Sequence, residues 1–326
     1  MPAVRKIAIL DDYQDVARSV ADWSRVDAEV TAFTSHLGGP DAVAEALEPF
    51  DAVVVMRERT ALTAQVFEKL PNLKLVVSTG PANVAIDVGA AQQRGITVSG
   101  TGGVATNAPT VEMTWALIHA LTRHVPEEDR RLRGGGWQQT VGRDLAGRRL
   151  GVVGLGGIGS SVAAVGRAFG MDVAAWSQNL DPETARSQGV TPVSKEELLE
   201  TSDVVTVHLK LSERTTGLIG RDDLARMTST ALLINTSRGP IVDEDALLEA
   251  LHAGTIGGAG LDVYGTEPLP ADSPFRSAPR TVLTPHLGYV TGETFAIMYA
   301  DAVEDVLAFV AGEPVRVYGV EQGSGN

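Results

Sequence analysis

Three polar side chains of different types follow three successive apolar runs in the second half of the chain. Arg238 lies in NTSRGPIVDE, Glu267 in GLDVYGTEPLP and His286 in TPHLGY. A histidine can carry a proton near neutral pH, and a neighbouring carboxylate orients the imidazole and favours its protonated form. A guanidinium binds a carboxylate through two hydrogen bonds and polarises an adjacent carbonyl. Each residue alone suits an ordinary loop, but the three together indicate chemistry that interconverts a hydroxyl and a carbonyl.

A glycine-rich turn precedes these residues. The stretch GVVGLGGIGSS places Gly154, Gly156 and Gly159 in a G-x-G-x-x-G pattern directly after an apolar run and before residues with helical spacing. Strand, turn and helix in this order form the pyrophosphate site of a dinucleotide-binding unit. A simple packing turn is the alternative, and the context favours nucleotide binding.

The carboxylate that usually binds the ribose in such a unit is missing. The strand expected at residues 173–176 is followed by Ser177 and, two residues later, by Asn179, while Asp172 stands at the opposite end of the strand. Without the carboxylate a 2′-phosphate is not repelled, and Ser177 and Asn179 offer it neutral hydrogen bonds, although the nearest downstream arginine is Arg186. We therefore predict NAD or NADP as cofactor, with NADP slightly favoured.

Short β-branched runs alternate with helical patterns along the chain, which predicts a doubly wound α/β fold with parallel strands. We expect strands at residues 7–10, 30–33, 52–56, 75–78 and 96–99 in the first half. A second series of six is expected at residues 150–153, 173–176, 204–207, 232–235, 259–263 and 282–284. Long helices are expected at residues 110–124 and 292–311.

The order of these elements predicts two domains. The passage SGTGGVATNAP is the candidate first crossing, and the last helix is expected to return to the first domain. We predict a Rossmann-type NAD(P)-binding domain at residues 103–290. It is inserted into a discontinuous, flavodoxin-like substrate-binding domain formed by residues 1–102 and 291–326.

Composition restricts the function classes. The formal net charge of −14 argues against nucleic acid or a membrane surface as partner. The absence of cysteine excludes thiolate catalysis, and the scattered histidines predict no metal site. No signal-peptide or membrane-spanning run stands out, so we expect a cytoplasmic protein.

Four motifs, GLGGIG, NTSRGPIVDEDAL, GLDVYGTEPLP and TPHLGY, make the chain resemble the D-isomer-specific 2-hydroxyacid dehydrogenases over nearly its whole length. The family includes D-3-phosphoglycerate dehydrogenase, glyoxylate and hydroxypyruvate reductases, D-lactate dehydrogenase and formate dehydrogenase. The resemblance implies a homodimer and hydride transfer between a nicotinamide and C2 of a small 2-oxo or D-2-hydroxy acid. A reductase of the glyoxylate or hydroxypyruvate type is favoured, and Glu267 argues against formate oxidation because formate dehydrogenases carry glutamine there.

The resemblance also implies residue roles. His286 would be the acid/base, Glu267 its partner and Arg238 the substrate clamp. Asp262 would lie near the nicotinamide carboxamide, and Gly157 with Ile158 would meet the pyrophosphate. Further cofactor contacts are expected at Thr236 and Gly288.

The chain departs from the family pattern in the loop that holds the substrate carboxylate. STGPAN replaces Gly-x-Gly-x-Asp-Asn, and Pro81 has no N–H, so Ala82 is expected to provide the contact.

In MRERT, Arg57 or Arg59 could bind a second substrate anion or be a solvated loop charge. The chain ends at Asn326, so serine feedback through a regulatory extension is not expected.

Two alternatives stay open. The first is a D-3-phosphoglycerate dehydrogenase, whose doubly charged substrate would require Arg57 or Arg59. The second is a nucleotide-sensing binding protein like the corepressors that resemble this fold.

Overall fold

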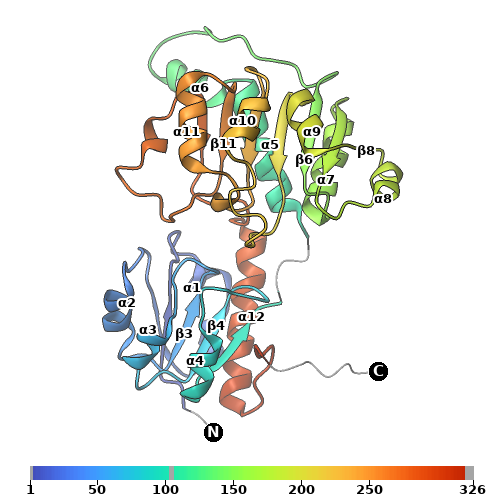
Figure 1. The fold of residues 1–326 in the computed structure, drawn as a ribbon. Coiled ribbons are helices and arrows are strands. Elements are labelled where there is room, and N and C mark those ends of the chain that lie inside the picture. Colours follow the sequence, from blue (N-terminus) through green and yellow to red (C-terminus); the bar gives the residue numbers. More distant parts are fainter. Residues whose placement is uncertain (1–2, 103–105, 320–326) are drawn as a thin grey trace. The chain divides into compact units, whose positions relative to one another are not determined.

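Figure 1 shows the fold of a computed structural model, which describes residues 3–102 and 106–319. Met1–Ala105 and Thr291–Asn326 form one unit, called the split unit, and Thr106–Val290 form the other, called the inserted unit. Part of the glycine-rich passage proposed as the first crossing, residues 103–105, lies outside the described residues.

A five-stranded parallel sheet with the order β2-β1-β3-β4-β5 forms the centre of the split unit. Its strands are β1 Lys6–Ile9, β2 Glu29–Ala32, β3 Ala52–Val55, β4 Leu75–Ser78 and β5 Thr97–Gly100. Its α-helices are α1 Ala17–Val20, α2 Pro40–Leu47, α3 Ala64–Glu68, α4 Val88–Gln93 and α12 Gly292–Ala311. This is the flavodoxin-like strand order, so the predicted doubly wound fold is confirmed.

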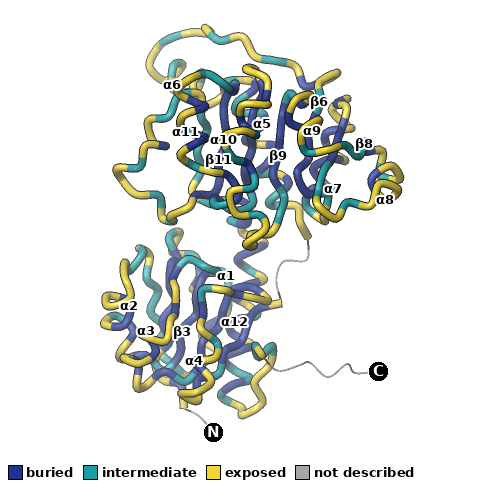
Figure 2. The backbone as a smooth tube through the Cα atoms, viewed as in Figure 1, coloured by how far each residue is buried: buried dark blue, intermediate teal, exposed yellow. Residues whose placement is uncertain are grey.

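The buried strands and the last helix account for the core of this unit. All residues of β3 and β4 are buried, as expected for strands covered on both faces. Helix α12 begins at the cap Thr291, whose hydroxyl accepts from the amide of Thr294, and packs on α1, β4 and β5. Figure 2 shows the continuous buried interior of the sheet. Within the described residues, no helix is long and apolar enough to cross a membrane.

A seven-stranded parallel sheet with the order β12-β11-β10-β9-β6-β7-β8 forms the inserted unit. Its strands are β6 Arg149–Val153, β7 Asp172–Trp176, β8 Thr191–Pro192, β9 Val204–Val207, β10 Leu232–Asn235, β11 Gly258–Leu261 and β12 Thr281–Leu283. Its α-helices are α5 Ala108–Thr122, α6 Val125–Arg133, α7 Gly157–Ala168, α8 Pro182–Ser187, α9 Lys195–Thr201, α10 Arg221–Arg226 and α11 Glu244–Ala253. The strand order is that of a dinucleotide-binding sheet, with its switch point between β6 and β9.

The prediction of six strands in this unit was wrong, because β8 adds a seventh. β8 has two residues, Thr191 and Pro192, and pairs only with β7 at the edge of the sheet. Two residues are too few to show a period of two, and proline argues against a strand unless the strand lies at an edge.

The helix expected at residues 110–124 corresponds to α5, and a separate helix, α6, follows it. α5 begins at Ala108, since Pro109 suits the first turn of a helix. It ends at Thr122, and His124 has a left-handed backbone with φ +52° before α6 begins. No residue of α6 is buried in the single chain.

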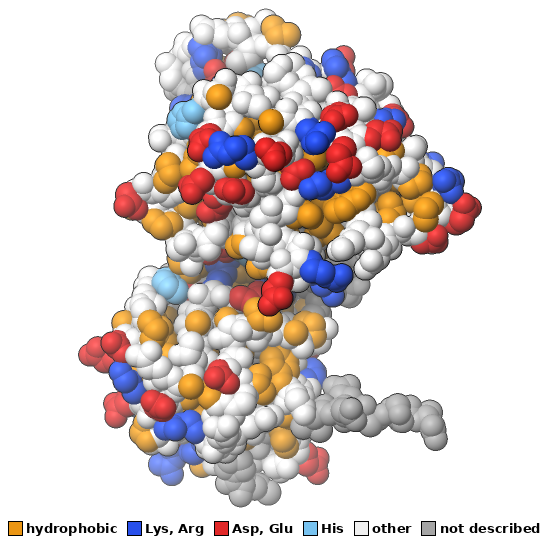
Figure 3. Space-filling view, viewed as in Figure 1, with side chains coloured by type: hydrophobic (Ala, Val, Ile, Leu, Met, Phe, Trp, Pro, Cys, Tyr) orange, Lys and Arg blue, Asp and Glu red, His pale blue; other side chains and the backbone are white. Residues whose placement is uncertain are grey.

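Acidic and basic side chains are interspersed on the face formed by α9, α10 and α11 (Figure 3). Arg221 pairs with Glu249, and Arg226 pairs with Glu200. Such exposed pairs contribute about 0 to 1 kcal/mol each, so the packing of the sheet dominates the stability of this face.

Candidate active site

The predicted glycine turn joins β6 to α7, and its glycines meet different steric demands. Gly154 has φ +102°, and a Cβ there would lie 2.6 Å from the carbonyl oxygen of His208. A Cβ at Gly159 would overlap the carbonyl of Gly154. A Cβ at Gly156, the N-cap of α7, would meet no atom within 4 Å. The open space at this cap fits the pyrophosphate of a dinucleotide.

The first residues of α7 face this space. Gly157 and Ile158 begin the helix, so their amides belong to the N-terminal donors that have no acceptor within the helix. A Cβ at Gly157 would lie 2.7 Å from the side-chain nitrogen of Asn107, the N-cap of α5. A larger residue at Gly157 would therefore require the Asn107 side chain to move.

The end of β7 carries no acid, as the sequence indicates. Ser177 follows Trp176, whose carbonyl accepts from the amide of Gly154 at 2.8 Å, so Ser177 lies beside the glycine turn. Ser177 is half-buried and Asn179 is exposed. Asp172 begins the strand and pairs with Arg149. The end of β7 beside the glycine turn thus carries neutral side chains.

The carboxyl ends of β10, β11 and β12 adjoin, because these strands are parallel neighbours in the sheet. Glu267 follows β11 and His286 follows β12, and Nδ1 of His286 lies 2.6 Å from Oε2 of Glu267. The other carboxylate oxygen of Glu267 accepts from the amide of Tyr264 at 2.9 Å. Both side chains are partly exposed, at 18% for His286 and 26% for Glu267. The structure therefore forms an oriented histidine–carboxylate pair that solvent or a ligand can reach.

The loop that carries His286 is folded around a buried acid. Asp262 accepts from the amides of Leu287 and Gly288 at 2.7 Å each and from the hydroxyl of Thr284 at 2.6 Å. Burial raises the pKa of Asp262 more than these three hydrogen bonds lower it. His286 has a left-handed backbone with φ +57°. Strain of this kind persists only where its surroundings hold it, and Asp262 supplies that restraint.

Arg238 follows β10, next to the strand whose loop carries Glu267. It is half-buried, its Nη1 donates to the carbonyl of Ser237 at 2.8 Å, and its own carbonyl accepts from Asn235 at 3.0 Å. A Cβ at Gly239 would overlap the backbone of Tyr264. The β10 and β11 loops are therefore in direct backbone contact, which places Arg238 beside the Glu267 loop.

Helix α5 contacts the same edge of the sheet. The hydroxyl of Thr114 lies 2.8 Å from that of Thr236, and Thr110 donates to the carbonyl of Gly288 at 3.0 Å. Thr236 and Gly288 are both buried. These two predicted cofactor residues thus connect α5 to the loops after β10 and β12.

The loop after β4 in the split unit contains Ala82. Among the described residues, the amides of Ala82 and Asn83 have no hydrogen-bond acceptor. A Cβ at Gly80 would lie 3.4 Å from Nη1 of Arg57, so this guanidinium lies against the loop. Arg57 has φ +49°; its amide donates to Thr79, and its carbonyl accepts from Asn83. Two amides without an acceptor and a guanidinium, which also lies 3.9 Å from the carboxylate of Glu58, are thus close together in this unit.

Arg59 lies elsewhere. Its guanidinium carbon is 5.1 Å from the centre of the Tyr13 ring, in a cation–π contact. Tyr13 donates to Asp11, which also accepts from Thr60. Of the two arginines in MRERT, the structure therefore places Arg57 at the amide loop.

Sequence reasoning missed three contributors to the site. Tyr264 orients Glu267 through its amide, and its hydroxyl donates to carbonyls of both Leu261 and Thr284. The ring of Tyr289 meets the His286 ring edge to face, with centroids 5.6 Å apart. The third contributor is Asp262, whose hydrogen bonds to the His286 loop were not predicted. Tyr264 and Tyr289 stand in the same motifs as the predicted residues, and that proximity was the available signal.

The remaining histidines show no comparable arrangement. Burial lowers the pKa of His208 to about 4, and its Nε2 lies 2.9 Å from the hydroxyl of Thr206. His208 is therefore neutral near pH 7. Within the described part of the chain, no three histidine or acidic residues are grouped as a metal site would require.

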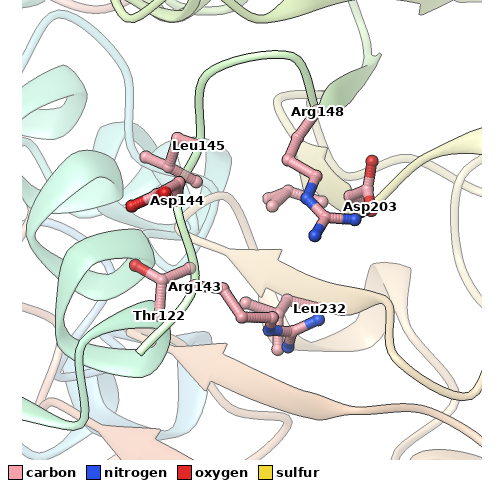
Figure 4. Close-up of a pocket in the computed structure, with 8 residues that line it drawn as sticks. Thr122, Arg143, Asp144, Leu145, Arg148, Asp203 and Leu232 are labelled. Atoms are coloured by element: carbon pink, nitrogen blue, oxygen red, sulfur yellow. Dashed lines mark hydrogen bonds and ion pairs between the residues drawn. The ribbon is translucent and has the colours of Figure 1, made fainter. Parts of the chain in front are cut away.

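Figure 4 shows a cavity at the opposite end of the inserted sheet. It lies at the amino ends of β6, β9 and β10 and is lined by Thr122, Arg143, Asp144, Leu145, Arg148, Asp203, Val204 and Leu232. Arg148 pairs with Asp203, and Arg143 donates to the carbonyl of Thr230. Since ligands of such sheets bind at the carboxyl ends, this cavity is separate from the candidate active site.

Comparison with known proteins points to the same chemistry. The NAD-binding domain of the D-isomer specific 2-hydroxyacid dehydrogenases matches residues 115–288. The chain is 40% identical over 277 residues to D-3-phosphoglycerate dehydrogenase of Bacillus subtilis (strain 168), covering 82% of this chain and 51% of that relative. It is 39% identical over 277 residues to glyoxylate reductase of Korarchaeum cryptofilum, covering 83% of each. The crystal structure of phosphoglycerate oxidoreductase from Vibrio cholerae has a TM-score of 0.89 and 37% identity, covering 94% of this chain and 99% of that one.

The chain belongs to the D-isomer specific 2-hydroxyacid dehydrogenase family of NAD(P)-dependent oxidoreductases. The predicted family and enzyme class are confirmed. The chain spans about half the length of the Bacillus relative, at 51%, but 83% of the archaeal one. Because the two relatives carry different activity names at almost the same identity, identity alone does not choose between their substrates.

Proposed function

We propose that this protein reduces a small 2-oxo acid to the D-2-hydroxy acid with NADPH or NADH, and that glyoxylate and hydroxypyruvate are its favoured substrates. The observation that carries the proposal is the 2.6 Å contact between His286 and Glu267. Glu267 follows β11 and His286 follows β12, and Arg238 follows β10, which is the neighbour of β11 in the sheet. Membership in the family supports the reaction class.

In the reducing direction, Arg238 holds the substrate carboxylate through charge-assisted hydrogen bonds and polarises the neighbouring carbonyl. Protonated His286 donates its Nε2 proton to the oxygen at C2 as negative charge develops there. Glu267, bonded to Nδ1, keeps the imidazole oriented and stabilises its positive charge. A reduced nicotinamide, when bound, supplies the hydride that adds to C2.

The residues of the inserted unit fit a dinucleotide, since Gly156 leaves open space at the N-cap of α7. We assign residues 103–290 to cofactor binding, with Gly154, Gly156, Gly157, Ile158 and Gly159 at the pyrophosphate. At the ribose, Ser177 and Asn179 can hydrogen-bond a 2′-phosphate without repelling it, which slightly favours NADP.

The nicotinamide end is assigned to Asp262, Thr236 and Gly288. Asp262 accepts three hydrogen bonds from Thr284, Leu287 and Gly288 in the segment that carries His286. A carboxylate has about four acceptor sites, so Asp262 retains capacity for one donor from a carboxamide. This assignment is compatible with its structural role in the His286 loop.

Residues 1–102 and 291–326 are assigned to substrate binding. The amide of Ala82 and the guanidinium of Arg57 lie in one loop region, so together they suit a carboxylate. Arg57 also supports a second candidate function, D-3-phosphoglycerate dehydrogenase, because its charge could bind the phosphate of that substrate.

We further propose that the protein forms a homodimer through α6 and the segment after it. α6 has no buried residue, and four large apolar side chains of this helix and the segment after it are exposed: Val125 at 53%, Leu132 at 58%, Trp137 at 72% and Val141 at 88%. Apolar side chains exposed together typically mark an interface. Light scattering of the purified protein tests this, and Trp137→Asp should shift a dimer toward monomer.

The test of the enzymatic proposal is a spectrophotometric assay with NADPH and NADH. The substrate panel is glyoxylate, hydroxypyruvate, pyruvate, a bulkier 2-oxo acid and 3-phosphohydroxypyruvate. The proposal predicts the highest kcat/KM with glyoxylate or hydroxypyruvate. Highest kcat/KM with the phosphorylated acid would favour the second candidate, and no oxidation with any of the five would contradict both.

A further inference from the structure

The chain segment of residues 315–318, called the clasp, pairs with the edge strand β5 of the split unit. The hydroxyl of Ser99 donates to the carbonyl of Val315 at 2.9 Å. The amide of Gly100 donates to Arg316, and the amide of Tyr318 donates to Val98. The clasp therefore extends the sheet beside the loop that contains Ala82.

Hydrogen bonds from the Arg316 side chain anchor the clasp to α12. Arg316 has φ +52°, and its guanidinium donates to Asp305 and to the carbonyl of Asp301 at 2.9 Å each. Asp305 is fully buried on α12. The backbone before Tyr318 is thus held by both the sheet and the helix.

The Tyr318 side chain contacts the loop that contains Ala82. Its hydroxyl donates to the carbonyl of Gly80 at 2.7 Å. A Cβ at Gly100 would overlap both Gly80 and the Tyr318 ring, so a glycine at this position permits the approach. Burial raises the pKa of Tyr318, and the phenol keeps its donor proton at any working pH.

The Gly80 carbonyl belongs to the peptide that leads into Pro81 and Ala82. Pro81 has no N–H, so the loop relies on the amides that follow it. At the far end of the loop, the side chain of Asn83 bonds to Arg57 and to Ser78. Asn83 fixes one end of the loop, and the hydrogen bond to Gly80 fixes the other.

We propose that Tyr318 is a positioning residue for substrate binding. By holding the Gly80–Pro81 peptide, it directs the amides of Ala82 and Asn83 at the substrate carboxylate. This inference rests on the proposed function of the loop. Tyr318 touches no reacting atom, so its effect falls on substrate affinity and leaves the proton transfer at His286 unchanged.

The experiment compares Tyr318→Phe with the parent protein under saturating cofactor. Loss of one hydrogen bond predicts a KM for the 2-oxo acid raised about 3-fold to 10-fold. We expect kcat within about 2-fold, an unchanged cofactor Kd and faster amide exchange at residues 82–84. Ser99→Ala is the matched control, since it removes a clasp bond that does not reach the loop, and its KM should stay at the parent value.

A second variant separates this inference from the function of the loop. Ala82→Pro removes the proposed donor and should raise KM and the Kd of oxamate, a 2-oxo acid mimic. If Ala82→Pro raises the KM and the oxamate Kd and Tyr318→Phe does not, the role of Tyr318 is overturned. If neither variant changes the KM or the oxamate Kd, the carboxylate site in this loop is overturned as well. Equal effects of Tyr318→Phe and Ser99→Ala would show a general structural role and also overturn the proposal.

Discussion

Nδ1 of His286 and Oε2 of Glu267 are 2.6 Å apart, although the two residues come from loops after different strands. Asp262 accepts a hydrogen bond from the loop that carries His286, and the amide of Tyr264 donates to the carboxylate of Glu267. Because Nδ1 is bonded to Glu267, the proton transfer proposed above uses Nε2 of His286. The contact between the two side chains lies within the inserted unit and supports the proposed role of His286 as general acid.

Replacing His286 with alanine should reduce kcat about 100-fold to 10,000-fold, the usual contribution of a positioned general acid. Cofactor affinity, measured by fluorescence titration with NADPH, should remain unchanged. His252→Ala, at an exposed position on α11, is the control and should retain full activity. Loss of both turnover and cofactor binding in His286→Ala would argue for a structural role.

Ser177→Asp should switch the cofactor preference. A carboxylate at this position repels a 2′-phosphate and accepts from ribose hydroxyls. We expect kcat/KM for NADPH to fall about 10-fold to 100-fold, while the value for NADH stays equal or rises. Ser187→Asp on α8 adds the same charge away from the turn and should change neither value. An unaltered NADPH/NADH ratio in Ser177→Asp would place the 2′-phosphate elsewhere.

Arg57→Ala should weaken binding of the substrate carboxylate. Loss of a charge-assisted contact predicts a KM raised about 10-fold or more. A larger loss for 3-phosphohydroxypyruvate than for glyoxylate would indicate that Arg57 binds the phosphate. Arg59→Ala is the comparison, since that guanidinium lies over Tyr13, and its effect should be smaller. Equal KM values for Arg57→Ala and the parent protein would contradict the assignment.

The buried Asp305 should make the stability of the split unit depend on pH. Burial raises its pKa to about 7, above the usual value of 3.8, and outweighs the attraction of Arg316. The folded state then binds a proton that the unfolded state releases between about pH 4 and pH 7. The free energy of unfolding should therefore fall as pH rises through this window, by up to about 4 kcal/mol.

Urea unfolding at pH 4.5 and pH 7.5 measures this dependence. Asp305→Asn should be less sensitive to pH than the parent protein, because its side chain does not titrate. Glu293→Gln, at an exposed position in the first turn of the same helix, should keep the parent slope. The same pH slope in Asp305→Asn and the parent would show that Asp305 does not titrate in this range.

Much of the inserted unit could be predicted from the sequence because its signals are local. β9 and β10 have the predicted bounds, since each is an apolar run between polar turns. The strand ends that carry Arg238, Glu267 and His286 follow from parallel pairing, which brings carboxyl ends to one edge. The two-residue β8 carries no periodic signal and was missed.

The contacts that could not be predicted join residues far apart in the chain. The bond from Tyr318 to Gly80 spans 238 positions and leaves no pattern in either segment. The choice of Arg57 over Arg59 depends on the backbone of a five-residue turn. The clamp formed by Asp262 requires the folded loop, because two of its three donors are backbone amides.

The most direct test of the account is the product formed with deuterated cofactor. Hydroxypyruvate is incubated with NADPH or NADH carrying two deuterium atoms at C4 of the nicotinamide, and the product is analysed by mass spectrometry and chiral chromatography. The account predicts D-glycerate with one deuterium at C2, and loss of this product in His286→Ala. Formation of the L-isomer, or of D-glycerate without deuterium at C2, would contradict it.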